Sequence, residues 1–152
     1  MKTWIAVINR AEARFFETNS RKDGELKFLS KIENPKGRMK AIDINADRPG
    51  VYTSSATTHR GLLVKPQSPV ERVSQMFALQ IARFLEHHRN QNSFDELTVI
   101  VEPHYLGKIR AAFSKELAAV VTREIPKDLR KVSNEQLKER LWPAGGTAEA
   151  EI

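Results

Sequence analysis

The spacing of hydrophobic and polar residues is typical of β-strands in the first part of this chain and of helices in the later part. The first 33 residues hold three short β-type segments separated by turn residues, among them an Asp-Gly pair that is typical of a hairpin. Residues 3–8 are continuously apolar, as in a strand buried on both faces. Residues 25–33 alternate instead, with Leu26, Phe28 and Ile32 on the apolar side. The pattern predicts an antiparallel meander with strands at residues 3–8, 13–18 and 25–33.

Helical periodicity dominates from residue 68 onward. Ser68, Pro69 and Glu71 form a capping box with proline in the first turn, and they begin a helix that runs to about residue 89. Its apolar stripe comprises Val73, Met76, Phe77, Ile81, Phe84, Leu85 and His88. Further helices are predicted at residues 105–113, 115–119 and 133–141, and short β-branched strands at 97–101 and 120–125.

The order of these elements indicates the fold class. Strands joined by tight turns pair antiparallel, whereas strands that follow a helical crossover lie parallel to a neighbour. The simplest sheet has the order 3-2-1-4-5, with helices packed on one or both faces. We therefore predict an α/β domain with a mixed five-stranded, ribonuclease-H-like sheet over residues 1–142, followed by a disordered tail at 143–152.

Residues 34–69, which we call the basic loop, form an unusually long connection for a domain of this size. Loops longer than about 15 residues are mostly functional or disordered. The basic residues of this loop are Lys36, Arg38, Lys40, Arg48, Arg60 and Lys65. Because the loop also contains Asp43 and Asp47, its net charge is +4, out of +6 for the whole chain. Because Tyr52 is its one Phe, Trp or Tyr, the composition favours phosphate contact over base stacking, with merely solvated charge as the alternative interpretation.

Composition narrows the classes of function. The chain of 152 residues has no cysteine, so disulfides and thiolate chemistry are excluded. A pI near 9.7 favours a polyanionic partner, either nucleic acid or an anionic membrane surface, although the charge also serves solubility. No apolar run reaches the roughly 20 residues that span a bilayer, and the N-terminus is unlike a signal peptide. We therefore expect a cytoplasmic protein without a membrane span.

A second candidate site, the crevice, is expected where the parallel strands end. In open α/β sheets, ligands bind beyond the carboxyl ends of the strands where strand order reverses, here between the first and fourth strands. The residues expected there are Asn9, Arg10, Glu102, Pro103, His104, Tyr105, Lys127 and Asp128. Arg10 and Arg14 would supply charge, and the helix that begins near His104 would offer free N–H groups to an anion. The alternative interpretation is that these residues only turn the chain and start a helix.

Enzymatic and metal chemistry finds little support in the sequence. Glu102 is the single carboxylate at these strand ends and does not hold the metal pair of a nuclease. His87 and His88 are adjacent on a helix and point about 100° apart, so they are poor co-ligands. There is no phosphate-binding glycine motif and no nucleophile elbow. We expect no catalytic residue, metal or cofactor, and keep a small enzyme in the crevice as the alternative. Its residues are Asn9, Arg10, His104 and Tyr105.

Five segments carry a resemblance to known proteins. They read W-I-A-V-I-N-R-A-x-A-R-F-F-E at residues 4–17, D-R-P-G at 47–50, F-A-x-x-I-A-x-F-L at 77–85, F-D-x-L-x-V-I-V-x-P-x-Y-L-G at 94–107 and I-P-K-D-L at 125–129. In this order and spacing they resemble the bacterial host attachment proteins, which are required for attachment to host cells. The resemblance covers nearly all of the chain to Leu141.

That resemblance implies a relation to the central domain of archaeal and eukaryotic peptide-chain release factors, whose sheet has the order predicted above. In that domain a Gly-Gly-Gln loop reaches the ribosomal peptidyl-transferase centre. The equivalent loop here, residues 34–69, has no Gly-Gly-Gln, and the Gly-Gly pair at 145–146 is followed by Thr147. We therefore expect a binding module for ribosomal or other RNA without release-factor hydrolysis, and any role in adhesion would be indirect.

Overall fold

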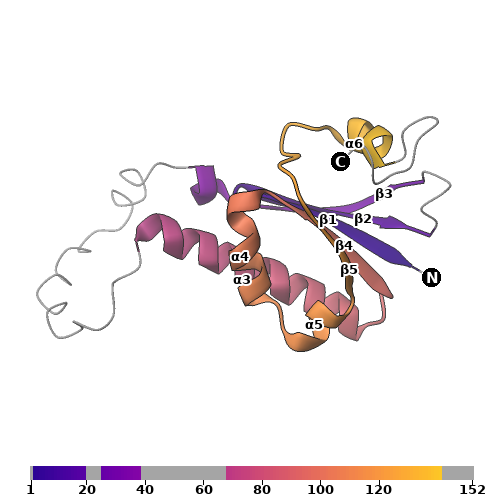
Figure 1. The fold of residues 1–152 in the computed structure, drawn as a ribbon, viewed down its shortest axis with the longest axis horizontal. Helices are drawn as coiled ribbons and strands as arrows, with labels where there is room; N and C mark the ends of the chain where they lie inside the picture. Colours follow the sequence, from indigo (N-terminus) through magenta and orange to yellow (C-terminus); the bar gives the residue numbers. More distant parts are fainter. Residues whose placement is uncertain (1, 20–24, 39–67, 142–152) are drawn as a thin grey trace, which may run out of the picture.

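The computed structural model describes residues 2–19, 25–38 and 68–141. Within these ranges one sheet contains β1 (Thr3–Ile8), β2 (Glu12–Thr18), β3 (Lys27–Glu33), β4 (Glu96–Val101) and β5 (Val121–Pro126). The strand order is β3-β2-β1-β4-β5 (Figure 1), with β1 antiparallel to β2 and parallel to β4, and β5 parallel to β4. The predicted mixed sheet and its order are confirmed.

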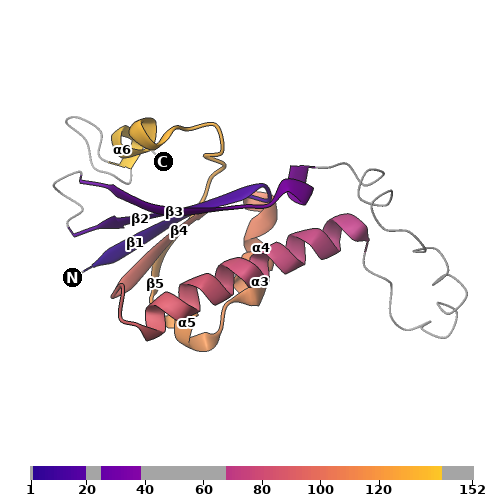
Figure 2. The ribbon, with the colours of Figure 1, turned by 180° about the vertical axis from the view of Figure 1, so that it is seen from behind.

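Helices cover both faces of the sheet. α3 (Pro69–Asn90), α4 (Leu106–Ala112) and α5 (Lys115–Ala119) lie on one face, and α6 (Asn134–Leu141) lies on the other (Figures 1 and 2). Two 3-10 turns, η1 (Pro35–Arg38) and η4 (Pro103–Tyr105), follow β3 and β4. The helix predicted at residues 105–113 is therefore η4 followed by α4. None of the described helices is both long enough and apolar enough to cross a membrane.

The central strand β1 is buried on both faces, as its unbroken apolar run predicts. Trp4, Ala6 and Ile8 belong to the core under α3, whereas Ile5 and Val7 belong to the core under α6. Burying each large apolar side chain contributes about 1.5–3 kcal/mol, so this six-residue strand stabilises both halves of the molecule.

The predicted alternation of β3 is only partly right. The register of β2 with β3 shifts so that Leu29 is an extra residue between the partners of Phe15 and Phe16. Because strand side chains alternate with a period of two, a bulge moves the following residues to the other face. Ile32 therefore packs under α3, while Phe28 contacts Phe16 on the α6 side, where it is 45% exposed.

The apolar stripe predicted for α3 is right except at Met76. Ser68 caps this helix, since its Oγ accepts a hydrogen bond from the Glu71 N–H. The buried arc contains Phe77, Ala78 and Ile81. At 100° per residue, Met76 points to the side of the helix opposite the centre of this arc, and it is 61% exposed.

Candidate functional site

The carboxyl ends of four strands meet at one edge of the sheet. β1, β3, β4 and β5 run in the same direction, because β2 is antiparallel to both β1 and β3. This carboxyl edge carries the β1–β2 turn, η1, η4 and the residues after β5. The first turn of α3 lies at the same end, since α3 packs against η1 (Figure 1). Residues 38 and 68, which bound the middle of the basic loop, are therefore close to this edge.

Asn9 shapes the turn that leaves β1. Its side-chain Oδ1 accepts hydrogen bonds from the N–H groups of Ala11 (2.7 Å) and Glu12 (3.0 Å). Its own N–H donates to the Glu12 carbonyl at 2.9 Å, and the residue is buried. The Asn9 side-chain oxygen is thus used by the turn, as is common for asparagine in such positions.

The start of the basic loop is held against this turn. The Asn34 N–H donates to the Ala11 carbonyl at 2.8 Å, and Asn34 Nδ2 donates to the Arg10 carbonyl at 2.9 Å. Gly37 packs on the same carbonyl so closely that a Cβ atom there would lie 2.0 Å from the Arg10 oxygen. η1 is therefore fixed to the end of β1 by both hydrogen bonds and close backbone packing.

Arg10 and Glu102 join the ends of β1 and β4. The N–H and Nε–H of Arg10 both donate to Glu102 Oε1, at 3.0 Å and 3.1 Å. The carboxylate side chain is 8% exposed, whereas the Arg10 side chain is 48% exposed. The backbone N–H of Glu102 also donates to the Ile8 carbonyl at 3.2 Å. One carboxylate oxygen thus fixes both the backbone and the inner side of the guanidinium.

The other crevice candidates do not converge on one site. Tyr105 is buried, and its hydroxyl donates to the Ser74 carbonyl of α3 at 2.6 Å. Burial, together with the negative charge of Glu102, raises the pKa of Tyr105 well above its ordinary value, so the hydroxyl stays protonated. His104 and Lys127 are exposed. The exposed Asp128 accepts a hydrogen bond from its neighbour in sequence, the Arg130 N–H, at 3.0 Å.

The topology explains why these residues do not surround an open crevice. In doubly wound sheets, the helices that flank a switch point cover opposite faces and leave a gap between them. Here α3, which leads into β4, and α4 and α5, which lead out of it, lie on the same face (Figures 1 and 2). Tyr105 fills the space between β4 and α3. This geometry gives no support to the alternative of a small enzyme at these residues.

Arg14 does not contribute charge to the carboxyl edge. It faces α6 and is buried, and its Nη groups donate to the carbonyls of Leu129 (2.8 Å) and Val132 (2.7 Å) and to Asn134 Oδ1 (3.0 Å). Its Nε lies 3.3 Å from a Glu12 carboxylate oxygen, although not in hydrogen-bonding geometry. Burial lowers the pKa of Arg14, an effect that Glu12 opposes. The residue holds the segment before α6 on the sheet.

The structure describes the basic loop only at its two ends, residues 34–38 and 68–69. Lys36 is exposed on η1, and Arg38 is the last residue of that turn. The remaining predicted phosphate contacts lie outside the described residues. They are Lys40, Arg48, Arg60 and Lys65. The predicted tail at 143–152 also lies outside them.

Comparison of the sequence with known protein families shows to which family this chain belongs. Residues 4–141 match the family of proteins described as "Protein required for attachment to host cells". The chain belongs to this host attachment family. The resemblance seen in the five sequence segments is thereby confirmed, whereas the relation to release factors stays a prediction.

Solved structures similar to this host attachment family member are distant. An archaeal protein is 12% identical with a TM-score of 0.47, over 94% of this chain and 33% of that one. A type II variant of the Ppx/GppA phosphatase of Aquifex aeolicus is 10% identical with a TM-score of 0.37, over 82% and 35%. The chain thus spans about a third of the length of these proteins. No curated protein matches it.

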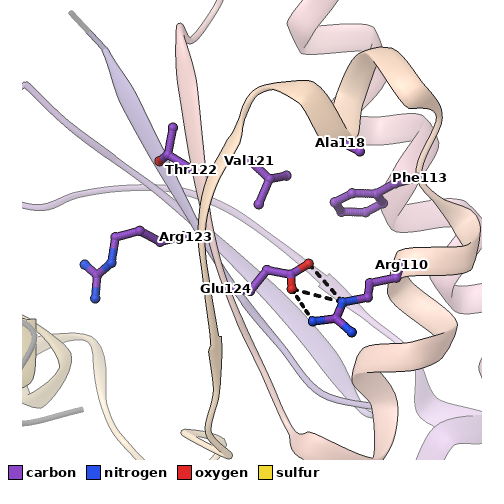
Figure 3. A pocket seen from close by; sticks show the side chains of 7 residues that line it. All are labelled: Arg110, Phe113, Ala118, Val121, Thr122, Arg123 and Glu124. Atoms are coloured by element: carbon purple, nitrogen blue, oxygen red, sulfur yellow. Dashed lines mark hydrogen bonds and ion pairs between the residues drawn. The ribbon is translucent and has the colours of Figure 1, made fainter.

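Two cavities of this family member lie away from the predicted residues. One, of about 460 Å³, lies between the outer edge of β5 and the helices α4 and α5 (Figure 3). Its lining residues are Arg110, Phe113, Ala118, Val121, Thr122, Arg123 and Glu124. The second, of about 270 Å³, lies between α3 and α4. Neither was predicted, because both depend on how α4 packs against elements distant in sequence.

The larger cavity offers little free polar chemistry. Arg110 and Glu124 point toward one another in Figure 3, and the Arg110 Nε lies 2.9 Å and 3.2 Å from the two carboxylate oxygens. This pairing raises the pKa of Arg110, so it keeps its charge. Within the described ranges, no group of His, Asp and Glu side chains is arranged to hold a metal ion.

Proposed function

We propose that this host attachment family member is a cytoplasmic binding module for ribosomal or other RNA. The family's description states a phenotype and no ligand, so the ligand is argued from charge. Lys and Arg neutralise phosphates and release the counterions condensed on a nucleic acid, which is the main source of non-specific affinity. The basic loop, residues 34–69, holds +4 of the chain's net charge of +6, and this supports an RNA partner.

The observation that carries the proposal is the way in which the loop begins. η1 is fixed to the end of β1 through Asn34 and Gly37, so Lys36 is presented from a rigid base at the carboxyl edge. α3, which begins where the loop ends, packs against η1. Basic residues that start from fixed backbone lose less entropy on binding than residues on a free chain. This arrangement supports a binding surface over a merely solubilising charge.

The expected binding mode is contact with phosphates without hydrolysis. Phosphate contacts position a protein on RNA but do not specify a sequence, so recognition of many single strands is expected. Similarity to a release-factor central domain is part of the proposal. The absence of Gly-Gly-Gln from residues 34–69 argues against peptidyl-tRNA hydrolysis by that motif.

The test is a fluorescence-polarisation titration of a labelled single-stranded RNA at several salt concentrations. With about four net phosphate contacts at roughly −0.7 each, log affinity should fall with log salt at a slope of about −3. Replacing Arg38, Arg48, Arg60 and Lys40 together by Ala should weaken binding to different sequences alike and flatten the slope.

A matched control variant distinguishes the effect of the loop residues from the effect of the overall net charge. The control variant replaces four exposed basic residues outside the loop by Ala and therefore changes the net charge equally. They are Arg83, Lys115, Lys131 and Lys138. The control should retain most of the affinity and the slope. Equal losses in both variants, or a wild type without salt-sensitive binding at low ionic strength, would contradict the proposal.

A further inference from the structure

Arg10 differs from Arg89 and Arg110 in the guanidinium atoms that bind its carboxylate partner. Its contact with Glu102 runs through Nε, and within the described part of the chain neither Nη group has a hydrogen-bond partner. Arg89 and Arg110, in contrast, bind their carboxylates through both Nε and Nη2. Arg10 therefore keeps the outer side of its guanidinium free for a ligand, although the inner side is fixed.

We propose that Arg10 is a pre-positioned contact for a phosphate group of the bound RNA, and that Glu102 is its positioning residue. A guanidinium presents two parallel N–H donors that match two oxygens of a phosphate. This inference deepens the proposed function and rests on it for the source of the phosphate. It adds a contact on the folded sheet to those of the basic loop.

The surroundings of Arg10 restrict the movement of its backbone. Its carbonyl accepts from Asn34 Nδ2 and packs on Gly37, and its N–H donates to Glu102. A side chain that starts from fixed backbone and is held at Nε retains few rotamers, which lowers the entropy lost when a ligand binds. The exposed Lys36 on η1 adds positive charge to the same end of the sheet.

Glu102 does not cancel this attraction. Its carboxylate is nearly buried behind Arg10, and the same Oε1 accepts both hydrogen bonds from Arg10. A phosphate that binds the outer side of the guanidinium meets the Nη donors first, with the carboxylate on the far side. Charge-assisted hydrogen bonds of this kind are about twice as strong as neutral ones.

The decisive experiment follows the arginine Nε–H signals by NMR of the ¹⁵N-labelled full chain. Titration with inorganic phosphate, and separately with an eight-nucleotide single-stranded RNA, should shift the Arg10 Nε–H and backbone N–H saturably. Arg110 is a matched control, because it is likewise exposed and bound to a carboxylate, but Glu124 occupies both its Nε and its Nη2. Its Nε–H signal should therefore stay unmoved. Equal shifts at both arginines, or no shift at Arg10, would overturn the inference.

Two variants separate positioning from charge. Arg10→Ala should weaken RNA binding about tenfold, as expected for loss of a charge-assisted hydrogen-bonding group, while Arg110→Ala should leave it unchanged. Glu102→Leu removes a negative charge but should also weaken binding, because the guanidinium is no longer held. Tighter binding by Glu102→Leu would refute the positioning role. If this variant does not fold, the wild-type signals of Arg10 and Arg110 still decide.

The same titrations distinguish this inference from the proposed function. The loop variant, with four basic loop residues replaced by Ala, should retain the phosphate-induced shift at Arg10. A shift with inorganic phosphate but none with RNA would support the phosphate contact and reject RNA as its source. Loss of the phosphate response in the loop variant would show that Arg10 is not an independent contact, and would overturn the inference.

Discussion

At the scale of single residues, His88 shows how burial disfavours the charged form of an ionisable group. His88 packs against Trp4 and Phe84, with ring centroids 5.0 Å and 4.7 Å away, and its Nδ1 lies 3.3 Å from Ser93 Oγ. Burial, and then the neighbouring His87, lowers the pKa of His88 below its ordinary value. A histidine at the end of a helix is normally stabilised in its charged form, but packing against two aromatic rings favours the neutral form here.

The lowered pKa of His88 predicts a loss of stability in mild acid. The unfolded chain takes up the proton near pH 6.5, before the folded protein does. The stabilisation should therefore be complete above about pH 6.5 and should decline as the pH falls through that value towards the lower folded pKa. Urea unfolding at pH 7.5 and pH 5.5 would measure it. His88→Gln should remove most of this pH dependence, whereas His87→Gln should reduce it only slightly, because His87 is the smaller of the two causes. Equal pH dependence in His88→Gln and wild type would contradict the assignment.

Arg14 is the second residue whose surroundings predict an effect. Replacing it by Met removes the donor to the Val132 carbonyl and one of the two donors to the Leu129 carbonyl, which also accepts from the Val132 N–H. This loss should lower the free energy of unfolding by about 2–4 kcal/mol. Chemical denaturation followed by circular dichroism would measure this loss. Arg130→Met is the control, because Arg130 is exposed and should change stability by less than about 0.5 kcal/mol. A similar loss in both variants would mean that Arg14 is not the specific link to the segment before α6.

At the scale of elements, the packing of η1 against the turn after β1 requires that residue 37 has no side chain. A Cβ atom on Gly37 would lie 2.0 Å from the Arg10 carbonyl oxygen and 2.7 Å from Asn34 Nδ2. The nearest atom is backbone, so no rotamer change relieves the contact. The base of the loop and the turn after β1 consequently form one unit, which is why this turn matters for the proposed RNA contacts.

Gly37→Ala should therefore release η1 from the end of β1. The overpacking should cost about 1–3 kcal/mol locally, and hydrogen exchange at the Asn34 amide should become faster. RNA affinity should fall as well. Gly107→Ala on α4 is the control, since a Cβ atom there meets nothing within 4 Å and alanine favours a helix by up to about 1 kcal/mol. Unchanged exchange at Asn34 in Gly37→Ala would show that η1 tolerates the side chain.

At the scale of the whole molecule, the sheet could be predicted because each strand had a local signal. The apolar run of residues 3–8, the turns and the N-cap at Ser68 depend on neighbours in sequence, and they led to the observed strand order. The bulge at Leu29 and the direction of Arg14 depend on partners in space. The predicted crevice rested on a rule for helices on opposite faces, and both crossovers lie on one face instead.

The position of β1 also affects how the chain folds during synthesis. β1 precedes the other described strands in the chain and lies close in sequence to β2, but its second partner is far away in sequence, because Thr3 pairs with Glu96. Such non-local pairing is slow, since a long stretch of chain must close before the contact forms. Until β4 has left the ribosome, one edge of the apolar strand β1 stays open to other chains. Because an unpaired apolar edge favours aggregation, we expect the nascent meander to be the stage at which this chain is most prone to aggregate.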